Sequence, residues 1–137
     1  MKIDKIKEMS SPELEKELAE LVVEEPKIEY KPNVSFDDFT KLELRVGEII
    51  ASEKVKNSDK LLVSQVKIGS DVRQIVSGIA NYYEPSQIIG KKVMVVVNLN
   101  PAKIRGNMSY GMLLCAEHEG KLTLIEVPNS VSGAKIS

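Results

Sequence analysis

The residues of this sequence best suited to bind a charged ligand lie in one connection between two apolar runs, residues 98–112. The connection carries two cations, Lys103 and Arg105, separated by one residue. In an extended segment both would project to one side, while Ile104 would point to the other side, toward the interior. Cations at this spacing suit the phosphates of a nucleic-acid backbone. The alternative is a long surface hairpin whose cations are only solvated.

A second connection, residues 54–60, is also basic and rich in turn-forming residues. It contributes Lys56 and Lys60 as further candidates for phosphate contacts. In the first connection Asn98 and Ser109 have side chains that can donate hydrogen bonds to phosphate or sugar. Both side chains can equally tie the connection to itself.

One further cation, Arg45, lies within an expected strand rather than in a loop. It is a candidate contact for a nucleic acid, ranked below the loop cations. A structural salt bridge to Glu43 or Glu48 is the competing interpretation.

The sequence offers little for catalysis. His118 and Cys115 are its only histidine and cysteine, and the carboxylates are scattered without the spacing of metal ligands. Cys115 lies in an apolar run, where a thiol is usually a small packing residue, and His118 lies beside a glycine turn. We therefore expect no catalytic residue, no metal site and no cofactor.

The 137 residues, 42% of them hydrophobic, suffice for one domain with a core and a short appendage. Residues 1–40 carry 6 Lys/Arg and 11 Asp/Glu (6 − 11 = −5), whereas residues 41–137 carry 13 and 9 (13 − 9 = +4). A basic globule with an acidic leader is compatible with nucleic-acid binding. A single cysteine, no signal peptide and no membrane-spanning run predict a cytoplasmic protein without a membrane partner.

The pattern of the chain predicts an amino-terminal part, residues 1–35, and a domain over residues 36–137. Ser11 and Pro12 start a helix with an apolar stripe, which ends near Pro26 and is followed by an extended linker. The domain reads as a series of strands separated by turns, and we place them at residues 42–49, 61–68, 72–76, 93–97, 112–117 and 122–127.

Residues 77–83 lose the two-residue alternation and look like a short helix or turn, closed by Pro85. Three meandering strands, a short helical segment and then further strands are the order of an oligonucleotide/oligosaccharide-binding (OB) barrel. We therefore predict an all-β fold: a five-stranded OB-fold Greek-key barrel with a short helix between strands three and four. A bulge at Gly47 would explain why the alternation of the first strand changes phase. In OB barrels the loops after strands one and four hold the ligand, which places the two basic connections at one mouth.

Motifs in the same order and spacing resemble a known family, the tRNA-binding domain of methionyl-tRNA synthetases. Stand-alone tRNA-binding proteins and cofactors of the endothelial-monocyte-activating-polypeptide type share this domain. The resemblance covers residues 36 to about 127. It is carried by Phe36-Asp37-Asp38-Phe39, Leu44-Arg45-Val46-Gly47, Asp59-Lys60-Leu61-Leu62, Val76-Ser77-Gly78-Ile79-Ala80, Gly90-Lys91-Lys92-Val93, Asn98-Leu99, Pro101-Ala102-Lys103, Arg105-Gly106, Ser109 and Gly111-Met112.

The resemblance implies a homodimer that binds tRNA by shape and backbone, lacks catalytic activity and raises the affinity of a synthetase for tRNA. A methionyl-tRNA synthetase catalytic subunit is then a further partner, and the chain would be its carboxy-terminal or beta part or a stand-alone protein. The chain departs from the family at Asn100, where many relatives have a cation, and Lys56 offers a compensating charge. A related secretion-chaperone family shares the barrel and the dimer mode, so a chaperone-like peptide-binding dimer is the alternative.

Overall fold

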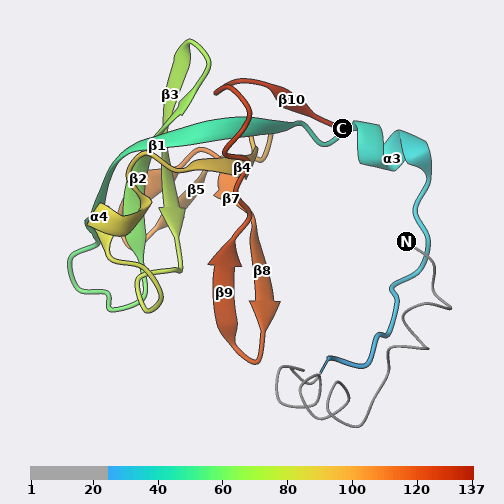
Figure 1. Ribbon diagram of the computed structural model, residues 1–137, viewed down its shortest axis with the longest axis horizontal. Helices are drawn as coiled ribbons and strands as arrows, with labels where there is room; N and C mark the ends of the chain where they lie inside the picture. Colours follow the sequence, from blue (N-terminus) through green and yellow to red (C-terminus); the bar gives the residue numbers. More distant parts are fainter. Residues whose placement is uncertain (1–24) are drawn as a thin grey trace, which may run out of the picture. The chain divides into compact units, whose positions relative to one another are not determined.

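The computed structural model describes residues 25–137 (Figure 1). The chain divides into two units, Met1–Pro32 and Asn33–Ser137. Residues 25–35 contain no helix or strand, and the helix predicted from Pro12 lies outside the described residues. No helix in the described part of the chain is long and apolar enough to cross a membrane.

The second unit is mostly β-structure, as the sequence predicted. Its elements are α3 (Phe36–Thr40), β1 (Leu44–Lys54), β2 (Leu62–Ile68), β3 (Asp71–Ser77), α4 (Pro85–Ile88), β4 (Lys92–Val96), β5 (Ala102–Ile104), β6 (Asn107–Ser109), β7 (Met112–Leu113), β8 (Cys115–His118), β9 (Lys121–Leu124) and β10 (Lys135–Ile136).

The principal sheet has the antiparallel order β3-β2-β1-β4-β7, and β10 is added to β1. Hydrogen bonds then connect the last part of the sheet to the first, because the Tyr110 amide donates to the Gln74 carbonyl at 2.8 Å. The β5–β6 and β8–β9 hairpins are separate two-stranded sheets. The curled sheet is therefore the predicted OB-type barrel, with the β5–β6 hairpin in the connection between β4 and β7.

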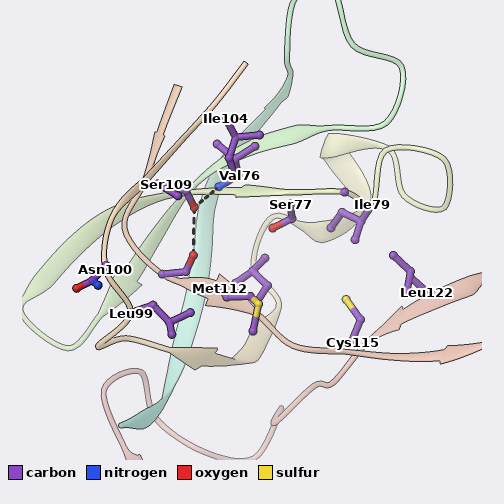
Figure 2. A pocket seen from close by; sticks show the side chains of 14 residues that line it. Val76, Ser77, Ile79, Leu99, Asn100, Ile104, Ser109, Met112, Cys115 and Leu122 are labelled. Atoms are coloured by element: carbon purple, nitrogen blue, oxygen red, sulfur yellow. Dashed lines mark hydrogen bonds between the residues drawn. The ribbon is translucent and has the colours of Figure 1, made fainter. Parts of the chain in front are cut away.

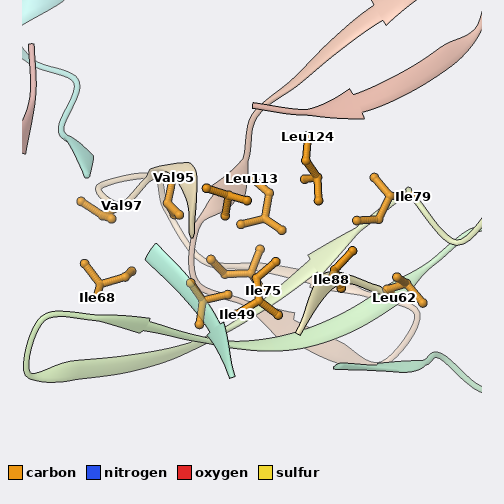
Figure 3. Packing of buried hydrophobic residues seen from close by; sticks show 12 residues of the cluster. Ile49, Leu62, Ile68, Ile75, Ile79, Ile88, Val95, Val97, Leu113 and Leu124 are labelled. Carbon is orange, nitrogen blue, oxygen red and sulfur yellow. The ribbon is translucent and has the colours of Figure 1, made fainter. Parts of the chain in front are cut away.

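Alternation along the strands places one apolar face of each inside the barrel. Val95, Leu113 and Leu124 face Ile49 and Ile75 across the interior, all of them nearly inaccessible to solvent (Figure 3). Removing these aliphatic side chains from water is the main stabilising contribution to the barrel.

The predicted bulge in β1 exists, but its predicted position was wrong. The register with β2 shifts between Ile49 and Ala51, so Ile50 is the extra residue. Gly47 serves packing instead: a Cβ there would lie 2.6 Å from Val66 Cγ1 and 2.8 Å from Val95 Cγ2. The glycine lets two strands of the barrel approach closely, and the register shift comes three residues later.

The short helix between β3 and β4 is present, but it begins later than residues 77–83. Ser77 still belongs to β3, a bend and a turn follow within residues 78–83, and α4 starts at Pro85, where a missing backbone donor costs nothing. Glu84 and Gln87 cap the helix reciprocally. Tyr83 then accepts a hydrogen bond from the Leu124 amide at 3.1 Å, so the turns are attached to the β8–β9 hairpin.

The tail after residue 127 folds back onto its own barrel. The Gly133 amide donates to the Val46 carbonyl at 2.7 Å, and the Ser132 hydroxyl accepts from the Gly69 amide at 2.9 Å. A Cβ at Gly133 would lie 2.8 Å from Gly69 Cα, so the backbones of the tail and of the β2–β3 turn touch. Val131 remains 70% exposed beside this attachment.

Candidate nucleic-acid interface

The central part of the connection between β4 and β7 is the β5–β6 hairpin, which closes in a two-residue turn. Arg105 (φ 50°) and Gly106 (φ 82°) are its central residues, and both adopt positive φ, as a type I′ turn requires. Lys103 lies in β5, opposite Met108. The expectation that Lys103 and Arg105 share an extended segment was therefore wrong, since Arg105 lies at the tip of the hairpin.

Ile104 is directed inward, as the sequence predicted. It packs against a small apolar cluster of Val55, Val63 and Val76, and Leu61 packs against the same cluster. Val55 and Leu61 bound the connection between β1 and β2, and the Val55 amide donates to the Leu61 carbonyl at 3.1 Å. The two basic connections therefore meet on one shared cluster, at the same mouth of the barrel.

Four exposed cations surround this meeting point: Lys56, Lys60, Lys103 and Arg105. We call them the basic rim. Within residues 25–137 none of the four lies within 4.0 Å of a carboxylate oxygen, in contrast to Lys41, Arg45, Lys54, Arg73 and Lys91. Lysines away from the rim, such as Lys67 and Lys121, also have no such partner there, so it is the grouping of the four that sets the rim apart. An ammonium or guanidinium group without a carboxylate partner has its donors available for phosphate oxygens.

Asn98 and Ser109 make their hydrogen bonds within the chain. Asn98 Oδ1 accepts from the Glu43 amide at 2.7 Å, and Asn98 Nδ2 donates to the Lys41 carbonyl at 2.6 Å. Ser109, only 4% exposed, accepts from the Val76 amide at 3.0 Å and donates to the Gly111 carbonyl at 3.1 Å (Figure 2). Both side chains thus position the connection, and a contact of either with tRNA stays a prediction.

Arg45 takes the structural alternative that the sequence left open. Its Nε lies 2.6 Å from Glu43 Oε2, and one terminal nitrogen donates to the Gly133 carbonyl at 2.8 Å. These bonds hold the folded-back tail against β1. Part of the guanidinium remains exposed, so a contact of Arg45 with a nucleic acid stays a prediction.

Sequence reasoning missed the residues of β3 that hold the base of the hairpin. Arg73 donates to the carbonyls of Val97 and Tyr110, which lie at the start and the end of the connection. Gln74 Nε2 adds a bond to the Met108 carbonyl at 2.9 Å. The signal was present, because a cation in the middle of an apolar strand needs partners there. The Arg73 guanidinium also lowers the pKa of Asp71, mainly through a hydrogen bond.

The groups considered for catalysis are not brought together. In the described part of the chain no three His, Cys, Asp or Glu residues are grouped so that they could hold a metal ion. The Cys115 thiol is partly buried, which raises its pKa and disfavours the nucleophilic thiolate. The nearest carboxylate to His118 is Glu119, 3.8 Å away in the adjacent turn.

Strand order and loop placement define an OB-type barrel in which the connections after β1 and β4 are basic. Residues 44–135 match the family described as "Putative tRNA binding domain", and the chain belongs to this family. It is 46% identical over 137 residues to the methionine–tRNA ligase of Caldanaerobacter subterraneus, a match that covers 99% of this chain and 21% of the relative. The chain thus spans about a fifth of the length of that relative.

Solved structures show the same fold. The MetRS-related protein of Pyrococcus horikoshii is 41% identical, with a TM-score of 0.74 over 78% of this chain and 100% of that one. The chaperone CsaA of Bacillus anthracis is 26% identical, with a TM-score of 0.71 over 77% of this chain and 100% of that one. The fold alone therefore accommodates both a synthetase-related protein and a chaperone, and the basic rim must be weighed separately.

Proposed function

We propose that this chain binds tRNA through its basic rim and so raises the affinity of a methionyl-type aminoacyl-tRNA synthetase for tRNA. The observation that carries the proposal is the placement, on two connections that share one apolar cluster, of four cations that have no carboxylate partner among residues 25–137. Such cations recognise the phosphate backbone and the shape of a folded RNA, with little dependence on sequence. The chain would do this as part of the synthetase or as a separate partner of its catalytic subunit.

We also propose that the domain works as a homodimer. The exposed Val131 lies on the tail that is bonded to β1 and to the β2–β3 turn, and it offers an apolar contact at a rigid place. Two copies would present two basic rims to one tRNA, which strengthens binding by raising the effective concentration of the second contact.

A chaperone-like peptide-binding dimer is the second candidate, supported by the likeness to CsaA. Its ligand would be an unfolded peptide, and the basic rim does not explain the binding of such a ligand. The two candidates therefore differ in the ligand that binds and in the response of binding to salt.

Gel retardation with tRNA over a range of salt concentrations, with an unfolded peptide as competitor, separates these candidates. Each phosphate contact contributes roughly 0.7–0.9 to the slope of log K against log salt, so four contacts predict a slope of about −3 per protomer. We expect that slope, similar affinity for different tRNAs, and no displacement by the peptide. Displacement of tRNA by the peptide, or binding that does not respond to salt, would favour the chaperone.

A further inference from the structure

A pocket of about 390 Å³ lies beside the β5–β6 hairpin (Figure 2). Its walls come from β3 and the following turn, from β7 to β9, and from β5. They are mostly apolar, and the partly exposed Leu99 and Met112 lie at its open side. We call it the β3–β7 pocket. Its volume lies in the range of pockets that hold small organic groups.

One polar group in this pocket lacks a partner. Ser77 Oγ is inaccessible to solvent, and no hydrogen bond reaches it from residues 25–137. The Ser77 side chain belongs to the pocket wall. A buried hydroxyl without a partner costs free energy. A rotation about χ1 of Ser77 would be needed to bring Oγ to a ligand in the pocket, and a ligand that then supplies the missing hydrogen bond is favoured.

The pocket shares a wall with the basic rim. Ala102 and Ile104 of β5 line the pocket, and Lys103 lies between them on the opposite side of the strand. Arg105 follows at the tip of the same hairpin. None of the 14 residues that line the pocket is an acid or a cation, so the pocket itself is neutral while its rim is basic.

We propose that the β3–β7 pocket receives one unstacked nucleobase of the bound RNA, whose flanking phosphates lie on Lys103 and Arg105. This inference rests on the proposed tRNA binding and adds a base contact to it. A nucleotide joins a flat neutral ring with polar edges to an anionic backbone, which matches a neutral pocket behind a cationic strand. A serine hydroxyl both donates and accepts, so it can meet the edge of different bases, in keeping with weak sequence preference.

An aliphatic side chain of a peptide fits this environment less well. It would fill the apolar volume but leave Ser77 Oγ without a partner, and a peptide has no fixed negative charge for Lys103 and Arg105. The base therefore satisfies more of the groups present than the peptide side chain does.

Gly78 lies at the pocket wall and is a position where a larger side chain can be introduced without a steric conflict at its Cβ. A Cβ built there meets nothing within 4 Å. We expect Gly78→Leu to lower tRNA affinity about tenfold, the order of magnitude of losing one base contact. The salt slope should stay unchanged, because no phosphate contact is lost. Asn81→Leu, an exposed position of the same turn segment outside the pocket, is the matched control and should bind as the wild type does.

Ser77→Ala tests the hydroxyl itself. The substitution removes a buried group that has no hydrogen-bond partner among residues 25–137, so the midpoint of thermal unfolding should stay the same or rise. Affinity for tRNA should nevertheless fall about threefold, as expected for one neutral hydrogen bond. Loss of affinity without loss of stability is not expected for a purely structural serine.

Cys115 reports on occupancy directly, since it is the single cysteine and it lines the pocket. At constant pH, saturating tRNA should slow the alkylation of Cys115 in the wild type. The same tRNA at high salt, where it is not bound, should leave the rate of alkylation unchanged. Each of three results would overturn the inference. The first is an unchanged tRNA affinity of Gly78→Leu, and the second is an unchanged rate of Cys115 alkylation when tRNA is added. The third is an unfolded peptide that binds the wild type but not Gly78→Leu, while both proteins bind tRNA equally. If the wild type fails to retard tRNA at all, the proposed function falls as well, which separates the two failures.

Discussion

Replacing Arg105 with alanine should weaken tRNA binding by roughly 1–3 kcal/mol and reduce the salt slope by about one contact. Its guanidinium is exposed at the hairpin tip and lies within ion-pairing distance of no carboxylate in residues 25–137. It can therefore grip a phosphate through two parallel donors, for which a lysine offers only a point charge. The free energy of unfolding should change by no more than about 0.5 kcal/mol. The arginine side chain buries little surface, and alanine adopts the positive φ of the turn at about the same cost as arginine does.

Two variants make this result specific. Arg105→Lys should bind between the wild type and Arg105→Ala, since it keeps the charge and loses the two-donor geometry. Lys121→Ala removes an exposed cation beside another two-residue turn, where Glu119 (φ 52°) and Gly120 (φ 79°) match the geometry of Arg105 and Gly106. Its affinity should equal that of the wild type. If Lys121→Ala and Arg105→Ala lose the same tRNA affinity, then Arg105 contributes only through the net charge of the protein.

Gly133→Ala should destabilise the domain by about 2–5 kcal/mol, because the clash costs roughly 1–3 kcal/mol and an alanine at positive φ costs roughly 1–2 kcal/mol. The new Cβ would lie 2.8 Å from Gly69 Cα and 2.9 Å from Gly69 N, and these are backbone atoms that cannot turn away. The substitution also acts on the residue whose carbonyl accepts from Arg45. Urea denaturation of the full chain measures the loss.

Gly90→Ala is the control for the strain alone. Gly90 has nearly the same φ, 92° against 91° for Gly133, and a Cβ there meets nothing within 4 Å. It should therefore lose only about 1–2 kcal/mol, the cost of placing alanine at positive φ. If the two variants lose the same stability, the close approach of tail and turn is not what holds the tail.

Much of the fold was predictable because its signals are local. Alternation located the hairpin of β2 and β3, and the run Val93–Val97 matched β4, which spans Lys92–Val96. The resemblance to tRNA-binding domains was confirmed by the family match over residues 44–135. The inward direction of the Ile104 side chain was predictable from its position between two cations, because a single apolar residue in a charged hairpin needs an apolar neighbour.

What failed depends on contacts between residues far apart in the chain. Gly47 was predicted to be a bulge because a glycine in a strand often marks one. A glycine is needed there because Val66 and Val95 approach it closely from other strands. The intrachain bonds of Asn98 reach Lys41 and Glu43, and no pattern around residue 98 announces them. Arg105 was misplaced for a local reason, since Arg-Gly is not the usual pair for a type I′ turn.

Hydrogen–deuterium exchange of the full chain, with and without saturating tRNA at moderate salt, tests the central claim most directly. The claim is that RNA lies on the two basic connections. We predict that tRNA slows exchange in residues 55–61 and 102–109, while the tip of the β8–β9 hairpin, residues 117–122, exchanges as it does in the free protein. Slowed exchange at residues 117–122 with none at the two basic connections would contradict the assignment of the basic rim as the tRNA contact.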